Sequence, residues 1–127
     1  MKKALFVLAV AGFVLAGCKS AVAPSNTVIL AVDKVQVPAT TAATTPLYVV
    51  LTVLRGACQT FGTIQSQRGA SGLTLTVYGT DPQKGCIDLG ISEPHTFRIE
   101  PPLPVGTFTI VVNRGRLSPL IATVQVE

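Results

Sequence analysis

Short runs of alternating apolar and polar residues fill the chain from Thr27 onward, and this alternation constrains the fold more than any other feature. Side chains of a β-strand point alternately to its two faces, whereas a helix needs a period of 3.6 residues, and no segment shows a convincing helical period. Val, Thr and Ile, which suit a pleated surface, dominate the runs. The runs predict strands at Val28–Val37, Leu47–Arg55, Gln59–Gln67, Leu73–Thr80, Cys86–Ile91, Thr96–Glu100, Gly106–Asn113 and Leu120–Val126.

The parity of each run predicts its buried face, because a shift of one residue would turn the apolar set toward solvent. The inward stripes are Leu47, Val49, Leu51 and Val53; Leu73, Leu75 and Val77; Phe108, Ile110 and Val112; and Leu120, Ala122, Val124 and Val126. This many strands in about 100 residues imply two packed sheets or a small barrel. Gly106–Asn113, preceded by Leu103-Pro104-Val105, resembles the late strands of immunoglobulin-like domains. We therefore predict an all-β, antiparallel, immunoglobulin-like β-sandwich of 7–8 strands.

The Thr- and Ala-rich segment from Pro38 to Pro46 has two interpretations. A flexible linker would detach the first strand from the domain, whereas a loop would cross between the sheets. We favour the loop, because a detached strand would expose its apolar residues to solvent. Turns are expected at Arg68–Gly72, Thr80–Gly85, Pro101–Pro104 and Arg114–Arg116, where Gly or Pro lets the backbone reverse.

The chain begins with Lys2 and Lys3, which precede an unbroken apolar run from Ala4 to Ala16. A basic start before a short apolar run is typical of an export signal, since a membrane-spanning helix needs about 20 apolar residues. The run ends in Leu-Ala-Gly-Cys18, which resembles the lipobox of bacterial lipoproteins. This resemblance implies that diacylglycerol is attached to the Cys18 sulfur and that cleavage precedes this residue. An ordinary secretory signal or a buried apolar helix is the alternative.

The resemblance divides the chain into a signal peptide (1–17), a lipidated cysteine and tether (18–26) and one β-sandwich domain (27–127). A single acyl chain binds a bilayer with an association constant of only about 10⁴ M⁻¹, whereas two or three chains make release negligible. In this family an aspartate after the cysteine often directs retention in the inner membrane, and Lys19 occupies that position here. We therefore expect a lipid-anchored cell-envelope protein, in the outer membrane of a diderm bacterium or otherwise on the outer face of the cytoplasmic membrane.

The two other cysteines, Cys58 and Cys86, predict a disulfide in an exported protein. If the third and fourth strands form a hairpin that turns near Ala70, Cys58 lies opposite the end of the fourth strand, and the next turn returns Cys86 to that end. Closing this loop would stabilise the domain by roughly 3.5 kcal/mol. A redox or metal-binding pair is the weaker alternative, because the spacing is not CxxC.

Charge and motif content exclude several classes of function. Without Lys2 and Lys3, eight basic residues remain against six acidic ones, a net charge near +2 that argues against a nucleic-acid partner. His95 is the single histidine, and we interpret it as a surface or edge residue rather than a ligand or base. The acidic residues lack calcium-loop spacing, and no GxSxG motif occurs. We predict no catalytic residue, metal or cofactor, and therefore not an enzyme.

One loop is a candidate for partner contact. Arg114 and Arg116 flank Gly115 between two strands and could present two cations, although a solvated hairpin turn is the simpler interpretation. We expect a monomeric, membrane-anchored envelope lipoprotein whose β-sandwich serves as a binding or structural module for an envelope protein or glycan. The alternative function is a periplasmic inhibitor of a hydrolase, in which this loop enters the active site of the partner.

Overall fold

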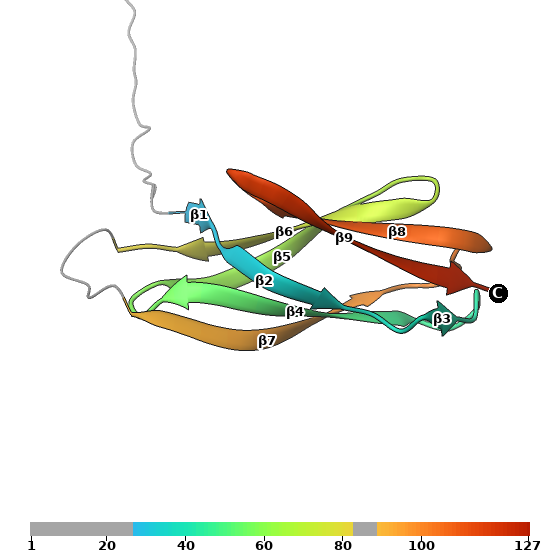
Figure 1. Cartoon of the computed structure of the whole chain (residues 1–127), viewed down its shortest axis with the longest axis horizontal. Coiled ribbons are helices and arrows are strands. Elements are labelled where there is room, and N and C mark those ends of the chain that lie inside the picture. The colour runs from blue at the N-terminus through green and yellow to red at the C-terminus, as the bar shows by residue number, and fades with distance from the viewer. Residues whose placement is uncertain (1–26, 83–88) are drawn as a thin grey trace, which may run out of the picture.

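The computed structural model describes residues 27–82 and 89–127, which form an all-β structure of two sheets (Figure 1). Within these residues there are nine strands and no helix, and therefore no helix able to cross a membrane. The strands are β1 (Thr27–Ile29), β2 (Ala31–Gln36), β3 (Thr40–Thr41), β4 (Leu47–Gly56), β5 (Thr60–Arg68), β6 (Gly72–Thr80), β7 (Gly90–Ile99), β8 (Gly106–Arg114) and β9 (Leu117–Val126).

The two sheets have six and three strands. The larger sheet has the order β1-β6-β8-β9-β3 with β5 also paired to β6, and the smaller sheet has the order β2-β4-β7. β6 is central in the larger sheet: β5 pairs along its whole length, whereas β8 pairs with its first half and β1 with its end. The chain changes sheet between β4 and β5 through a tight turn, in which the Gln59 N–H donates to the Gly56 carbonyl at 3.0 Å.

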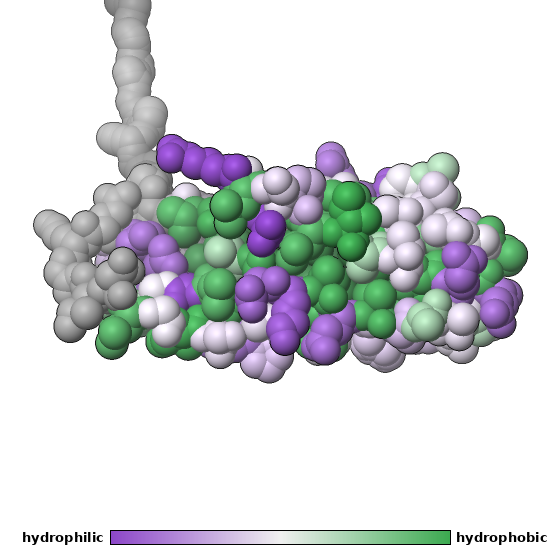
Figure 2. All heavy atoms as spheres, in the orientation of Figure 1, coloured by the Kyte–Doolittle hydropathy of each residue, from purple (hydrophilic) through white to green (hydrophobic). Residues whose placement is uncertain are grey.

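The core lies between the sheets and confirms most of the parity prediction. The stripes of β4, β6 and β8 are all buried, with exposed fractions of 5% or less. On β9, Val124 and Val126 are buried, while Leu120 and Ala122 are half-buried. Figure 2 shows apolar side chains gathered along the middle of one face, with strongly polar groups around them. The alternation in the sequence therefore predicted the orientation of the long strands correctly.

The strand pairing differs from the expected antiparallel sandwich in two places. β6 pairs with β8 in parallel, and β3 pairs with β9 in parallel. The first difference arises because the chain crosses to the smaller sheet and forms β7 before it returns as β8. The β-sandwich architecture is confirmed with nine strands instead of 7–8, and the likeness to immunoglobulin domains stays a prediction.

The first predicted strand, Val28–Val37, is two strands in different sheets. β1 joins β6 and β2 joins β4, with Leu30 between them. The Leu30 N–H donates to the Val77 carbonyl at 2.9 Å, and its side chain is only 2% exposed. The Pro38–Pro46 segment then leads from β2 in the smaller sheet to β3 in the larger one, so it crosses between the sheets as expected.

In place of the strands predicted at Cys86–Ile91 and Thr96–Glu100, the described residues form the single strand β7, and residues 86–88 lie outside the described part of the chain. The residues between the two predicted strands include Pro94. The proline is accommodated because β7 is an edge strand whose one partner among the described strands is β4, so the missing backbone donor can face away from that partner. Residues 92–95 are therefore part of the sheet, and this changes the interpretation of two polar side chains described below.

Candidate functional site

A polar network lies where β4 ends and β7 begins. The Arg55 guanidinium donates two hydrogen bonds to the Glu93 carboxylate, from Nε to Oε2 at 3.0 Å and from Nη2 to Oε1 at 3.2 Å. His95 Nε2 lies 2.9 Å from the same Oε2 atom. The three side chains are 20–27% exposed, so water screens their interactions less than on an open surface.

Two further contacts extend the network to the turn after β4. Arg55 Nη1 donates to the Gln59 carbonyl at 2.7 Å, and Gln59 Oε1 accepts from the Gly56 N–H at 2.7 Å. Gln59 Nε2 donates to Asp81 Oδ2 at 3.0 Å, which connects this turn to the end of β6. The network therefore connects three segments at one end of the sandwich: the end of β4 with the turn that follows it, the start of β7, and the end of β6.

Phe61 links the network to the edge of the larger sheet. Its ring stacks on the ring of His95 with centroids 3.8 Å apart and an angle of 11° between planes. Phe61 lies on β5 and His95 on β7, so this contact joins the edge strands of the two sheets. As predicted for a lone histidine, His95 lies at a sheet edge, and its immediate partners are Phe61 and a carboxylate.

The Glu93 carboxylate is held in its ionised form. Hydrogen bonds from Arg55, and secondly from His95, lower the pKa of Glu93 from its ordinary value of 4.5 to about 2. Both of its oxygens accept hydrogen bonds within the network. We therefore interpret the network as a structural connection between β4, β5 and β7 rather than as a reactive site.

This lowered pKa predicts a loss of stability in acid. A carboxylate with a depressed pKa stabilises the folded state fully above its unfolded pKa, and this contribution is lost as the pH falls from about 4.5 to about 2. Glu93→Gln should therefore show a smaller drop in melting temperature between pH 5 and pH 2 than the wild type. Thermal melts at several pH values measure it, with Glu100→Gln as the control at an ion pair that is more than half exposed. Parallel curves for wild type and Glu93→Gln would contradict the assignment.

Sequence reasoning missed this network, although one signal for it is present. Glu93 and His95 are two residues apart, and such residues lie on the same face of a strand. Because both residues lie between the strands predicted at Cys86–Ile91 and Thr96–Glu100, the prediction did not place them on one face. The contribution of Arg55 could not be found in this way, since it depends on the long-range pairing of β4 with β7.

The predicted partner loop is a tight hairpin turn between β8 and β9. Gly115 has a φ of 68°, and its N–H donates to Asn113 Oδ1 at 3.0 Å. Arg114 Nε donates to the Ser118 carbonyl at 2.7 Å, and its Nη1 reaches the Val32 carbonyl at 3.4 Å. The two arginines therefore differ: Arg114 holds the turn in place, while Arg116 is exposed at the tip.

The predicted lipidation and disulfide sites are only partly covered by the structure. Cys18 and the signal and tether regions around it lie outside the described residues, as does Cys86. Cys58 follows β4 and is exposed. The pairing of Cys58 with Cys86 stays a prediction. Across residues 27–82 and 89–127, no three His, Cys, Asp or Glu side chains are grouped to hold a metal ion.

The outer face of the six-stranded sheet is polar and uncharged along its four long strands. The outward positions of β5, β6, β8 and β9 follow from the registers, in which cross-strand partners share a face. They include Thr63, Gln65, Gln67, Thr74, Thr76, Tyr78, Thr80, Thr107, Thr109, Val111, Asn113, Pro119, Ile121, Thr123 and Gln125. None is charged, and most carry a hydroxyl or an amide. We call this surface the threonine face.

The outer face of the three-stranded sheet has a different character. Arg98 and Glu100 form a 2.8 Å ion pair there, and the Arg98 guanidinium lies 5.9 Å from the centre of the Tyr48 ring. Lys34 of β2 is also exposed. The two outer faces therefore differ in charge, and the threonine face is the one suited to an uncharged partner.

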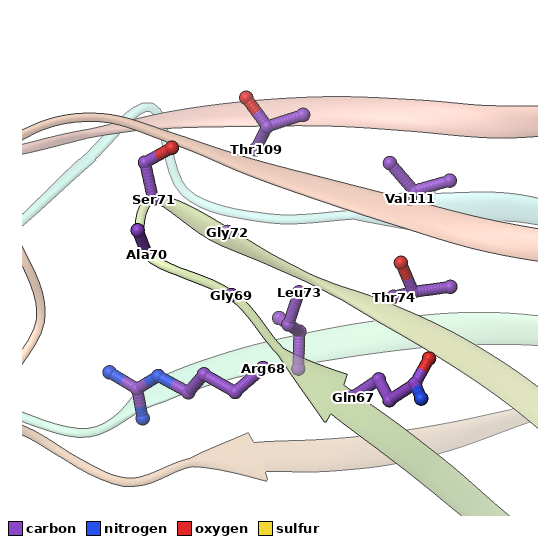
Figure 3. A pocket seen from close by; sticks show the side chains of 10 residues that line it. All are labelled: Gln67, Arg68, Gly69, Ala70, Ser71, Gly72, Leu73, Thr74, Thr109 and Val111. Carbon is purple, nitrogen blue, oxygen red and sulfur yellow. The ribbon is translucent and has the colours of Figure 1, made fainter.

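An open hollow of about 480 Å³ marks one end of the threonine face, at the turn between β5 and β6. Gln67 and Thr74 line it together with Thr109 and Val111 of β8, as Figure 3 shows. A second hollow of about 220 Å³ adjoins it over Gln65, Thr76 and Tyr78. The two hollows share Gln67 and Thr74 in their linings and lie along β5 and β6.

Comparison with protein families, with curated proteins and with solved structures finds no match to this chain.

Proposed function

We propose that this protein is a lipid-anchored cell-envelope lipoprotein whose β-sandwich is a binding module, and that the threonine face is its binding surface. The signal-like start and the Leu-Ala-Gly-Cys18 sequence support the anchoring. The observation that carries the binding role is the uncharged outer face of the six-stranded sheet, with hollows along β5 and β6.

The chemistry of this face favours a neutral, hydroxyl-rich ligand such as a glycan of the envelope. Thr, Gln and Asn side chains offer both donors and acceptors, which match sugar hydroxyl and acetamido groups. Tyr78 lies at one end of the face and adds an aromatic ring with a polar tip. A face without charges gives no electrostatic attraction, so we expect weak binding that salt hardly affects.

Two variants test the two parts of the proposal in the same cells. Cys18→Ser should abolish incorporation of labelled palmitate, because the thiol is the acceptor of the lipid. Thr76→Lys should keep the label but lose at least tenfold in affinity for uncharged N-acetylglucosamine oligosaccharides, since it places a charge in the second hollow. Thr96→Lys, at an exposed position of β7, is the matched control. Equal labelling in Cys18→Ser overturns the anchor, and equal sugar binding in Thr76→Lys overturns the binding face.

A hydrolase inhibitor is the second candidate, and one observation favours it. The turn after β8 is held by Arg114, while Arg116 is exposed at its tip, an arrangement suited to entering an active site. Pre-ordering of this kind reduces the entropic cost of binding. Activity assays on hydrolases captured from envelope extract, with wild type and Arg116→Ala, distinguish this role from glycan binding.

A further inference from the structure

The strand β5 has an open edge that is not protected in the usual way. β6 is its only pairing partner among the described residues, so the backbone groups on its other side have no strand to bind. Beyond a bulge near Gly62, the segment Thr63–Gln67 contains no proline and no charged residue. Uncharged, unpaired edges of this kind readily accept another strand.

The other strands with an open edge carry features that oppose strand addition. β2 has a bulge together with Asp33 and Lys34, β7 contains Pro94, and β9 contains Pro119. β1 and β3 are only three and two residues long. Proline, charge, bulges and short length are the common means by which proteins prevent pairing at an edge. The open edge of β5 is thus an exception within the same molecule.

A hollow of about 230 Å³ lies beside this edge, between the two sheets. Ser66 of β5 and Phe97 of β7 line it, and Leu73 and Ile99 are its buried apolar residues. The exposed charged residues Arg68, Arg98 and Glu100 line it as well. Side chains of a strand paired to β5 would alternate between solvent and this hollow. The hollow can therefore receive the inward apolar side chains of an added strand.

Two contacts limit the length of this site. The stacked rings of Phe61 and His95 connect the sheets at one end. At the other end, Arg68 reaches across and donates hydrogen bonds to the Glu100 and Pro102 carbonyls, each at 2.8 Å. The open stretch between them is the five residues Thr63–Gln67, which span about 17 Å.

We propose that the β5 edge binds an extended peptide segment of a partner protein by strand addition. The partner segment has uncharged residues with apolar side chains at alternate positions, and it enlarges the six-stranded sheet. Its backbone supplies the hydrogen bonds, and its apolar side chains enter the hollow beside Phe97. This site is separate from the threonine face, so it does not depend on glycan binding.

The probe for this site is a synthetic peptide with the sequence of β6, Gly72–Thr80, flanked by lysines for solubility. β6 already pairs with β5 on its other side, with Leu73, Leu75 and Val77 inward, so its alternation fits the register. Fluorescence anisotropy with the full chain should show saturable binding. The same peptide with proline in place of the threonine equivalent to Thr76 should bind at least tenfold more weakly, because it lacks a central backbone donor.

Ser66→Lys is the decisive protein variant, because Ser66 is exposed and lines the hollow. It should weaken peptide binding at least tenfold, whereas Thr123→Lys, at an exposed position on β9, should stay within twofold of the wild type. Circular dichroism confirms that both variants are folded. Equal peptide binding by wild type and Ser66→Lys overturns the proposal. A wild-type dimer that Ser66→Lys dissociates would also overturn it, because the occupant would then be a second copy of the chain.

Discussion

Phe108→Ala should lower the free energy of unfolding by about 3–5 kcal/mol, the usual cost of emptying a large aromatic site in a core. Phe108 is fully buried on β8, opposite Val124 of β9 and between the two sheets. The Arg68 guanidinium lies 5.9 Å from the centre of its ring, so the substitution also removes the surface beneath this cation. A domain of this size has a total stability of only about 5–15 kcal/mol, so the variant should be close to unfolding.

Urea denaturation followed by circular dichroism measures this loss. The control is Val105→Ala, because Val105 is 75% exposed and precedes the same strand. Its effect should stay within about 0.5 kcal/mol. A loss below about 1 kcal/mol for Phe108→Ala would show that the core does not depend on this ring and would contradict the packing of β8 against β9.

Gly72→Ala should lower the free energy of unfolding by about 1–3 kcal/mol or more, through steric overlap and not through loss of a contact. A Cβ atom at Gly72 would collide with the backbone carbonyl oxygen of Thr109, which cannot move without separating the strands. Gly72 is the first residue of β6 that pairs with β8. The strain would therefore act on the parallel pairing of these two strands.

Gly90→Ala is the matched control for this substitution. Gly90 also begins a strand, but no atom of the described residues lies within 4 Å of a Cβ placed there. The two variants therefore make the same chemical change in different surroundings, and their denaturation midpoints should separate clearly. Equal stability of Gly72→Ala and Gly90→Ala would contradict the parallel arrangement of β6 and β8.

The buried faces of the sandwich could be predicted from the sequence because they depend on local alternation. In Leu47–Val53 and Leu73–Val77 the alternation of apolar and polar residues predicts which side chains are buried. This prediction does not require knowing which strands are paired. The gap predicted between the strands Cys86–Ile91 and Thr96–Glu100 was wrong for a related reason. A proline disfavours a central strand, yet whether β7 is central or at an edge depends on distant parts of the chain.

The order of the strands and the polar network could not be predicted in this way. The parallel neighbours β6 and β8 are separated along the chain by β7, and no local sequence pattern indicates that they pair. The ion pair of Arg55 and Glu93 could not be predicted for the same reason, because it depends on the pairing of β4 with β7, which are far apart in the sequence. The threonine face was present in the alternate positions of the runs, but it becomes one surface only when β5, β6, β8 and β9 are aligned.

Because β1 pairs with the end of β6, the described chain starts at one end of the elongated sandwich. We call this end proximal and the opposite end distal. The chain enters at Thr27, beside Thr80, and the turn between β5 and β6 lies at the opposite end of β6 (Figure 1). The carboxyl terminus is also distal, where the Glu127 N–H donates to the Thr41 carbonyl. In a protein tethered through its amino terminus, the hollow beside Ser71 would therefore be presented away from the bilayer, with the long axis of the sandwich acting as a spacer.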